Sequence, residues 1–155
     1  MRLRIIAVGE RMPGWVASAF DEYARRLRTS MPLELRPLAT ARRSDGDAGR
    51  AMADEGRRIL SQLQPRDHVV ALDERGPQMS TVELARWLET RRASGQDLVF
   101  VIGGPDGLAP EVLARCPQRW SLSKLTLPHG LVRVVLAEQL YRAASVLAGH
   151  PYHRP

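Results

Sequence analysis

Residues 97–108, "DLVFVIGGPDGL", are the stretch of the chain that says most about its fold. The first half is a continuous apolar run, which is typical of a strand covered on both faces at the centre of a parallel sheet. The second half breaks that strand with paired glycines and a proline. In open parallel sheets, ligands bind beyond the carboxyl ends of the strands, where such loops gather. The stretch therefore predicts the type of sheet and one wall of a ligand site.

Strand-like and helix-like segments alternate on both sides of this stretch. Apolar patterns predict strands over residues 3–8, 33–38 and 68–72, and helices over residues 14–28, from the loop at 40–50 to about 63, 81–93, 111–116 and 131–148. Pro37 suggests that its strand lies at an edge. Ser80 with Glu83 forms a capping box, and Pro110 suits the first position of a helix. The pattern predicts one α/β domain over residues 1–155 with a largely parallel sheet.

The composition is that of an ordinary soluble globular protein, with 155 residues, 44% hydrophobic and 26% charged. No apolar run approaches the roughly 20 residues that cross a bilayer, and the first residues do not resemble a signal peptide. The single cysteine, Cys116, excludes an internal disulfide and favours a cytoplasmic location. Because Cys116 precedes a proline at a predicted helix end, we expect a buried, unreactive thiol.

The net charge of +6 suggests an anionic partner such as RNA. Almost all of the positive charge is arginine, however, and a composition bias alone could produce it. The charge by itself leaves both interpretations open.

Three loops stand out as possible ligand sites: "LDERG" (72–76) and "GGPDG" (103–107), which follow predicted strands, and "SLSKLTLPHG" (121–130), which precedes the last predicted helix. The glycines of the second loop either let a ligand approach the backbone or serve a tight turn. The loop is neither a G-x-G-x-x-G fingerprint nor a P-loop. If the third loop is irregular, its leucines could line an apolar slot while its backbone reads the edge of a heterocycle such as adenine. It also contains the only lysine, Lys124.

The last predicted helix is apolar almost all round, so we expect burial on more than one face, the second face against an identical subunit. Arg133, Glu138 and Arg142 interrupt the apolar surface, which argues against a membrane span. The tail "GHPYHRP" (149–155) is either a solvated end or a site that stacks and donates hydrogen bonds. No zinc spacing occurs, and Pro151 separates His150 from His153, so we predict no metal site.

At these residues the chain resembles a known family. The segments "VIGGPDGL" (101–108), "WSLSKLTLPHGLVRVVLAEQLYRA" (120–143) and "HPYHR" (150–154), together with the opening "MRLRIIAVGERMPGWV", are similar to RlmH, the bacterial family of large-subunit rRNA pseudouridine N3-methyltransferases. The resemblance covers nearly the whole chain and is weakest over residues 40–66.

The resemblance implies a SPOUT-type α/β fold with a C-terminal trefoil knot, which periodicity could not have predicted. It further implies a homodimer that uses S-adenosylmethionine to methylate N3 of a pseudouridine in 23S rRNA of the assembled ribosome. The cofactor site that it implies comprises Leu72, Gly103, Gly104, Leu122, Ser123, Lys124, Leu125, Thr126 and Leu127. Within the family pattern Lys124 and Gly130 stand at variable positions, so the uniqueness of Lys124 gives it no catalytic role.

Methylation of N3 requires loss of a proton whose pKa is well above neutral, so a base or a stabiliser of the ring anion is needed. The residues do not identify that base. The substrate-side candidates are His129, Glu138, Arg142, Tyr152, His153 and Arg154. Arginines could hold phosphates or the ring anion, Tyr152 could stack on a base, and the histidines could relay a proton. A structural role is an equal alternative for each of them.

Two other functions compete with this hypothesis. A non-enzymatic ribosome- or RNA-binding protein would also suit the charge and the size, and it would have no affinity for S-adenosylmethionine. A flavodoxin-like or other small nucleotide-binding enzyme would suit the sheet, but no matching phosphate loop occurs in the sequence.

Overall fold

The computed structural model describes residues 1–43 and 46–154. Strands β1 to β5 span Leu3–Val8, Leu33–Leu38, His68–Leu72, Leu98–Ile102 and Gln118–Trp120. Helices α1 to α5 span Gly14–Leu27, Ala48–Ser61, Thr81–Ser94, Pro110–Arg115 and His129–Leu147, and a short 3-10 turn, η2, spans Pro151–His153. The alternation of strands and helices that the apolar pattern predicted is confirmed.

The strands form one parallel sheet in the order β2-β1-β4-β3-β5. β4 lies at its centre and all five of its residues are buried, as its unbroken apolar run predicted. β2 lies at an edge, as Pro37 predicted, because a proline cannot donate a hydrogen bond to a strand on its other side.

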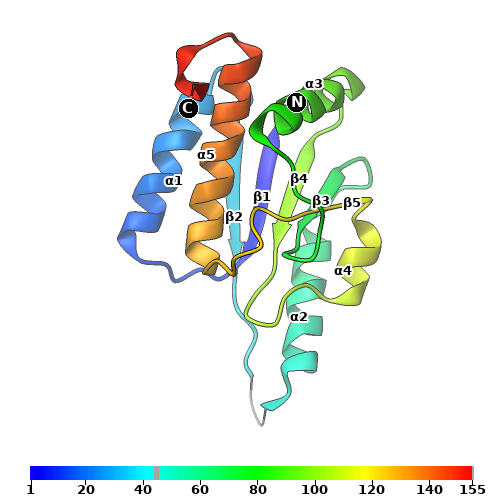
Figure 1. Ribbon diagram of the computed structural model, residues 1–155. Helices are drawn as coiled ribbons and strands as arrows, with labels where there is room; N and C mark the ends of the chain where they lie inside the picture. Colours follow the sequence, from blue (N-terminus) through cyan, green and yellow to red (C-terminus); the bar gives the residue numbers. More distant parts are fainter. Residues whose placement is uncertain (44–45, 155) are drawn as a thin grey trace.

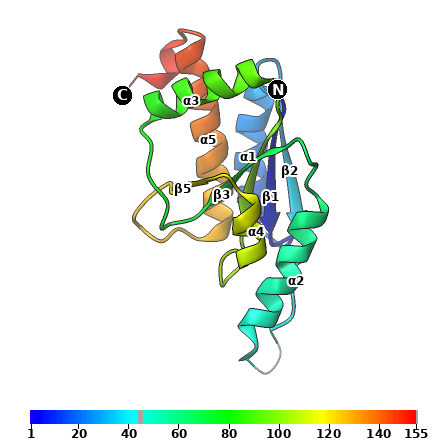
Figure 2. The same cartoon turned by 90° about the vertical axis from the view of Figure 1, so that its right-hand side faces the viewer.

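The sheet is sandwiched between two layers of helices (Figures 1 and 2). Phe100 and Ile5 pack with α1, α3 and α5 on one face, while Val99 and Val101 pack with α2 and α4 on the other. Because side chains alternate along a strand, a strand buried on both faces must be apolar at every position. The helices leave the carboxyl ends of the strands to the connecting loops.

The helix ends follow local chemistry. The capping box is confirmed at α3, where the Glu83 N–H donates to Ser80 Oγ at 3.1 Å and the Ser80 N–H donates to the Glu83 carboxylate at 2.6 Å. Pro110 is the first residue of α4, as predicted. The predicted start of α5 at Leu131 was wrong: the helix begins at His129, because Pro128 occupies the N-cap and its carbonyl accepts from the Val132 N–H.

β5 is a strand that the sequence interpretation left out. It has three residues, and Trp120 pairs with Leu72 of β3 at the far edge of the sheet. Three residues are too few to establish a period of two, so the apolar pattern could not reveal this strand. Because β5 is parallel to β3, the segment that follows β5 starts at the carboxyl ends of the strands, beside the loops after β3 and β4.

Arg133 points into the protein rather than interrupting the outer surface of α5. Only 2% of the residue is exposed, and its Nη2 donates to the carbonyls of Val8 at 3.2 Å and Gly9 at 2.6 Å. Burial lowers the pKa of its guanidinium. This contact joins the last helix to the carboxyl end of the first strand. No helix within the described ranges is both long and apolar enough to cross a bilayer.

Candidate functional site

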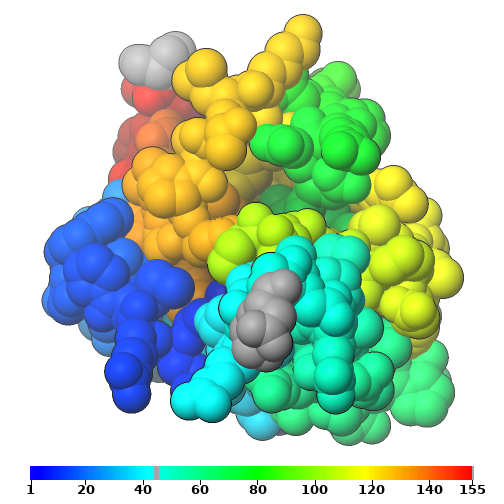
Figure 3. Space-filling model, turned by 90° about the horizontal axis from the view of Figure 1, so that it is seen from below, coloured from blue at the N-terminus to red at the C-terminus, as the bar shows by residue number. Residues whose placement is uncertain are grey.

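A cavity of about 500 Å³ lies at the carboxyl ends of β3, β4 and β5. Figure 3 views the molecule from this edge of the sheet and shows the hollow between the surrounding loops. The cavity is within the size range of small-molecule sites, and the position is where parallel sheets bind ligands. Its walls are residues 72–75, 102–108, 119–123 and 125–127, together with Leu113, His129 and Val132.

The loop after β4 supplies one wall, and its paired glycines are required by contacts inside the protein. A Cβ added to Gly103 would lie 2.6 Å from the backbone of Gly107, and one added to Gly104 would lie 2.7 Å from Glu55 Oε1. The Gly107 N–H also donates to the Gly104 carbonyl at 3.0 Å. Of the two interpretations of these glycines, the structure supports the tight turn, while both residues line the cavity.

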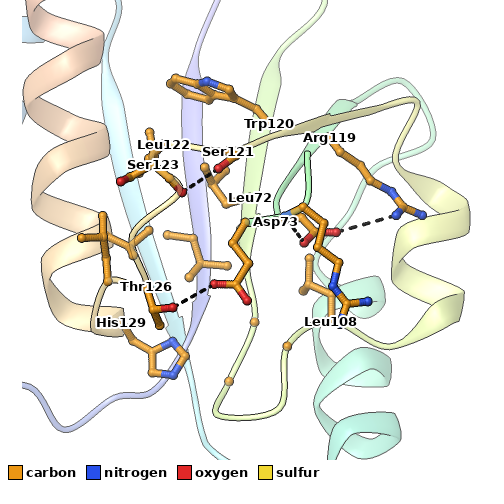
Figure 4. A pocket seen from close by; sticks show the side chains of 18 of the residues that line it. Leu72, Asp73, Leu108, Arg119, Trp120, Ser121, Leu122, Ser123, Thr126 and His129 are labelled. Atoms are coloured by element: carbon orange, nitrogen blue, oxygen red, sulfur yellow. Dashed lines mark hydrogen bonds and ion pairs between the residues drawn. The ribbon is translucent and has the colours of Figure 1, made fainter. Parts of the chain in front are cut away.

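The segment after β5 supplies the opposite wall as an irregular loop. The Ser121 hydroxyl donates to the Ser123 carbonyl, the Leu125 N–H donates to the Ser123 hydroxyl, and the Thr126 hydroxyl donates to Glu74 (Figure 4). These three hydrogen bonds hold the backbone of the segment, which is neither helix nor strand. Leu122 is half-buried in the wall, whereas Leu125 is 74% exposed and lies at the rim.

Lys124 is the one residue of the implied cofactor set that does not line the cavity. It is exposed, because it is the central residue of the turn that the Ser123 hydroxyl closes with the Leu125 N–H. The other eight residues of that set all lie in the walls.

The loop after β3 adds acidic groups that sequence reasoning did not select. Asp73 and Glu74 lie in the cavity wall, next to Leu72. Asp73 accepts from the Arg75 N–H at 3.0 Å and lies 3.7 Å from the Arg119 guanidinium. Their position directly after a buried strand was the signal that could have identified them. The cavity thus combines an apolar slot with both carboxylates and guanidinium groups, since Arg75 and Arg119 also lie in its wall.

The six substrate-side candidates fall into two groups, with His129 at the amino end of α5 and the other five from the middle of the helix onward. His129 lines the cavity, and Figure 4 shows its ring near Thr126. Arg142 lies thirteen residues further along the helix, about 20 Å at 1.5 Å per residue. Glu138 lies on the same helix, and Tyr152, His153 and Arg154 follow its end, so the chain does not bring these five residues to its own cavity (Figure 1).

The five distant candidates lie in or beside an ordered group of side chains. The Tyr152 hydroxyl donates to Glu138 Oε1 at 3.2 Å, and Arg142 Nε donates to the same oxygen at 2.8 Å. The Arg142 guanidinium lies 4.9 Å from the centre of the Tyr152 ring, which meets Tyr141 edge-on at 4.6 Å. We call Tyr23, Arg26, Glu138, Tyr141, Arg142 and Tyr152 the tail cluster.

Two members of the tail cluster, Tyr23 and Arg26 of α1, were missed by sequence reasoning. The Arg26 guanidinium lies 5.5–5.7 Å from the ring centres of Tyr23, Tyr141 and Tyr152. Burial raises the pKa of the Tyr152 hydroxyl, which therefore stays protonated near neutral pH. Within the described part of the tail, Tyr152 therefore packs on α1 and α5, while His150, Pro151 and Arg154 are exposed. The only signal for Tyr23 and Arg26 was their place on one face of α1.

Two other sequence expectations concern metal and thiol chemistry. Over residues 1–43 and 46–154, no three His, Cys, Asp or Glu side chains gather in a way that could hold a metal ion. Cys116 is half-buried, its thiol donates to the Val112 carbonyl at 3.2 Å, and burial raises its pKa to about 11. Such a thiol carries little thiolate at neutral pH, in agreement with the expected lack of reactivity.

Comparison with known proteins identifies relatives along the whole chain. A family profile described as "Predicted SPOUT methyltransferase" matches residues 1–153. The chain is 53% identical over 155 residues to the Ribosomal RNA large subunit methyltransferase H of Stenotrophomonas maltophilia (strain K279a), with 99% of both chains covered. It is 56% identical, with the same coverage, to the protein of that name from Alkalilimnicola ehrlichii.

Solved structures support the fold. A methylase family protein from Haemophilus influenzae Rd KW20 matches with a TM-score of 0.54 at 16% identity, over 99% of this chain and 70% of that one. A methylase family protein from Neisseria gonorrhoeae matches with a TM-score of 0.51 at 15% identity, over 90% and 81%. Together with the family profile and the parallel sheet, these matches confirm the predicted SPOUT-type α/β fold. The chain belongs to the SPOUT methyltransferase family.

Proposed function

We propose that the protein uses S-adenosylmethionine to methylate 23S rRNA, at N3 of a pseudouridine in the assembled ribosome, in the cytoplasm. The observation that supports this most is the cavity at the carboxyl ends of β3, β4 and β5 in a chain of this family. The names of the 53–56% identical relatives support the large-subunit rRNA as substrate.

The cavity residues fit S-adenosylmethionine. Leu72, Ile102 and Leu122 offer an apolar slot for the adenine, and the loops of residues 103–107 and 121–127 offer backbone groups for its edge. The carboxylates of Asp73 and Glu74 would face the positive charges of the ligand. When bound, S-adenosylmethionine supplies a methyl group that the sulfonium already activates, so orientation by these walls provides much of the rate.

The ring N–H of the substrate must also lose a proton. His129 lines the cavity, and histidine is the side chain that most often serves as a general base in enzymes. We propose His129 as the first candidate for the base, while Arg142 and Arg154 are candidates for holding the ring anion or the phosphates.

The position of the tail cluster favours action across a dimer. Residues 152–154 follow the far end of α5, and Arg142, which donates to the Tyr152 carbonyl, lies about 20 Å along the helix from His129 in the cavity wall. Val135, Val146 and Leu147 on α5 are only half-buried, and Val82 on α3 is exposed. A second copy that covers these apolar groups in an antiparallel way would bring each tail to the partner's cavity. The homodimer and the trefoil knot belong to the same proposal.

Three measurements test the proposed activity. Calorimetric titration with S-adenosylmethionine should give a micromolar Kd, and labelled methyl groups should enter the 23S rRNA of intact ribosomes. Mass mapping of rRNA from cells that lack the protein should then show one unmethylated pseudouridine. Absence of any binding heat at high protein concentration would instead favour the non-enzymatic ribosome-binding protein.

A mixing experiment tests the action across the dimer. A variant with a blocked cavity, Gly103→Val, and a variant that lacks residues 151–155 should each be inactive. After exchange of subunits in an equal mixture, half of the dimers are mixed and each holds one complete site, so about a quarter of the activity should return. Failure of exchanged, mixed dimers to methylate would exclude action across the dimer.

A further inference from the structure

A buried acidic group below the cavity connects three segments that are far apart in the sequence. In the sheet, β1 lies between β2 and β4. The segment after β2 and the loop after β4 therefore both start beside the carboxyl end of β1. Glu55 of α2 lies between them, with 2% of its side chain exposed. One carboxylate oxygen accepts from the Ala41 N–H at 2.9 Å and from Arg43 Nη1 at 2.8 Å, and the other accepts from Arg43 Nη2 at 3.0 Å.

Arg43 extends this group to the cavity loop. Its Nε donates to Asp106 Oδ2 at 2.8 Å, and Asp106 lies in the cavity wall. Its Nη1 also donates to the Ala41 carbonyl at 2.9 Å. All three guanidinium nitrogens therefore have partners, and the planar fork holds two carboxylates from different elements in one arrangement.

Glu55 also touches the loop directly. A Cβ added to Gly104 would lie 2.7 Å from Glu55 Oε1 and 3.1 Å from Val8 Cγ1. Gly104 thus rests on the Glu55 carboxylate and on the end of β1, while Asp106 is held from the side by Arg43. The loop is fixed at two points by groups that do not line the cavity.

We propose that Arg43 and Glu55 are positioning residues for the cofactor, which hold the loop of residues 103–107 in the shape that binds S-adenosylmethionine. The inference rests on the proposed use of that cofactor. Loops at ligand sites often open locally at a low free-energy cost while the rest of the fold stays intact. Contacts that hold such a loop therefore determine what fraction of the molecules has the binding conformation. Ligand affinity falls in proportion to the loss of that population.

Substitutions at the exposed end of the group provide the test. Asp106→Asn removes the charge of a residue that is 39% exposed and leaves the pair of Arg43 with Glu55 intact. Arg43→Lys keeps the charge but lacks the planar fork that donates from two nitrogens to Glu55 and from a third to Asp106. We expect each variant to weaken S-adenosylmethionine binding about five- to tenfold in calorimetry, and the double variant to be no weaker than the worse single one. The KM for the cofactor should rise while kcat at saturating cofactor stays unchanged.

The matched control is Asp54→Asn, which removes an ion pair with Arg57 on the same helix, with Arg57 70% exposed. It should leave cofactor affinity unchanged. Unchanged cofactor affinity in Asp106→Asn and Arg43→Lys would overturn the inference. It would also be overturned if the losses of affinity added up in the double variant and paralleled a lower midpoint of urea unfolding. If the wild-type protein itself binds no S-adenosylmethionine, the proposed function fails before this inference is tested.

Discussion

The two ends of α5 are built in different ways. At the amino end, the cavity is formed by three loops whose shape depends on backbone contacts such as that between Gly103 and Gly107. At the carboxyl end, the tail cluster is formed by rings and charges, with the Arg26 guanidinium between three tyrosines. One end has an apolar slot of the kind found at small-molecule sites, and the other has arginine and aromatic side chains, the residue types that are common at nucleic-acid sites.

This difference determines how each end can be disabled. A backbone-built site is lost when atoms are added to it, because close-packed loops have no room to adjust. A site built from side chains is lost when atoms are removed. Substitutions at the two ends should therefore separate cofactor binding from action on the ribosome.

Removal of residues 151–155 should have the largest effect on action at the ribosome. The deletion takes away Tyr152, His153 and Arg154 but leaves every wall of the cavity. Methylation of ribosomes should fall by about 100-fold or more, since several contacts worth about 1–3 kcal/mol each are lost together. The Kd for S-adenosylmethionine should stay within about twofold of wild type by calorimetry. Tyr152→Phe, which keeps the ring, is the control and should retain most of the activity. Normal methylation by the truncated protein would mean that the tail has no part in the reaction.

Gly103→Val should have the largest effect on the cofactor. The added side chain would overlap the backbone at Gly107, so the loop must move and the cavity wall changes shape. We expect S-adenosylmethionine binding to weaken by about 30-fold or more, with a loss of about 1–3 kcal/mol in the free energy of unfolding. Gly14→Ala is the control, because nothing lies within 4 Å of its added Cβ. Unchanged affinity in a folded Gly103→Val protein would show that the ligand binds elsewhere.

Arg26→Ala should have an intermediate effect that is confined to the tail cluster. It removes the guanidinium that contacts three tyrosine rings, each contact worth about 0.5–1 kcal/mol at a partly exposed site. We expect kcat/KM for ribosomes to fall about tenfold while cofactor affinity is unchanged. Arg25→Ala is the matched control, since both Arg25 and Arg26 form ion pairs with Glu22, but Arg25 is 62% exposed. Equal losses in both variants would assign the effect to the ion pair rather than to the rings.

Cys116 lies at neither end of α5, and we expect its substitution to have the smallest effect of the four changes. Its folded pKa of about 11 is above its ordinary value near 9, so the folded state keeps the proton that the unfolded state releases. Its contribution to stability is therefore fully present below pH 9 and is lost as the pH rises through 11. The loss should reach at most about 2 kcal/mol relative to Cys116→Ala, measured by urea unfolding at each pH. Equal pH profiles would show that the thiol is solvated, and methylation at neutral pH should be the same in both proteins.

Most of the fold and the cavity end could be predicted from the sequence, because both depend on local patterns. The unbroken run of β4, the loop that follows it and the capping box of α3 each signal their structure over a few residues. Eight of the nine residues that the family resemblance implied lie in the cavity wall. The exception, Lys124, is turned outward by a hydrogen bond of the Ser123 hydroxyl, which sequence spacing does not show.

The remaining features depend on contacts between segments that no local pattern connects. β5 is defined by its pairing with β3, and Arg26 meets Tyr141 and Tyr152 only after α1 and α5 have packed. The contact of Arg43 with Asp106 spans 63 positions. Arg133 was read as a break in an apolar surface because a helix pattern alone does not tell which charged side chain points inward.

The buried contact of Arg133 with the carbonyls of Val8 and Gly9 has a consequence for the synthesis of the protein. These carbonyls are made 124 to 125 residues before their donor. Until α5 leaves the ribosomal exit tunnel, the end of β1 lacks this donor, and the cavity lacks His129 and Val132, which α5 supplies. A chain that ends before α5 therefore lacks both the contact that joins this helix to β1 and the part of the cavity wall that the helix supplies.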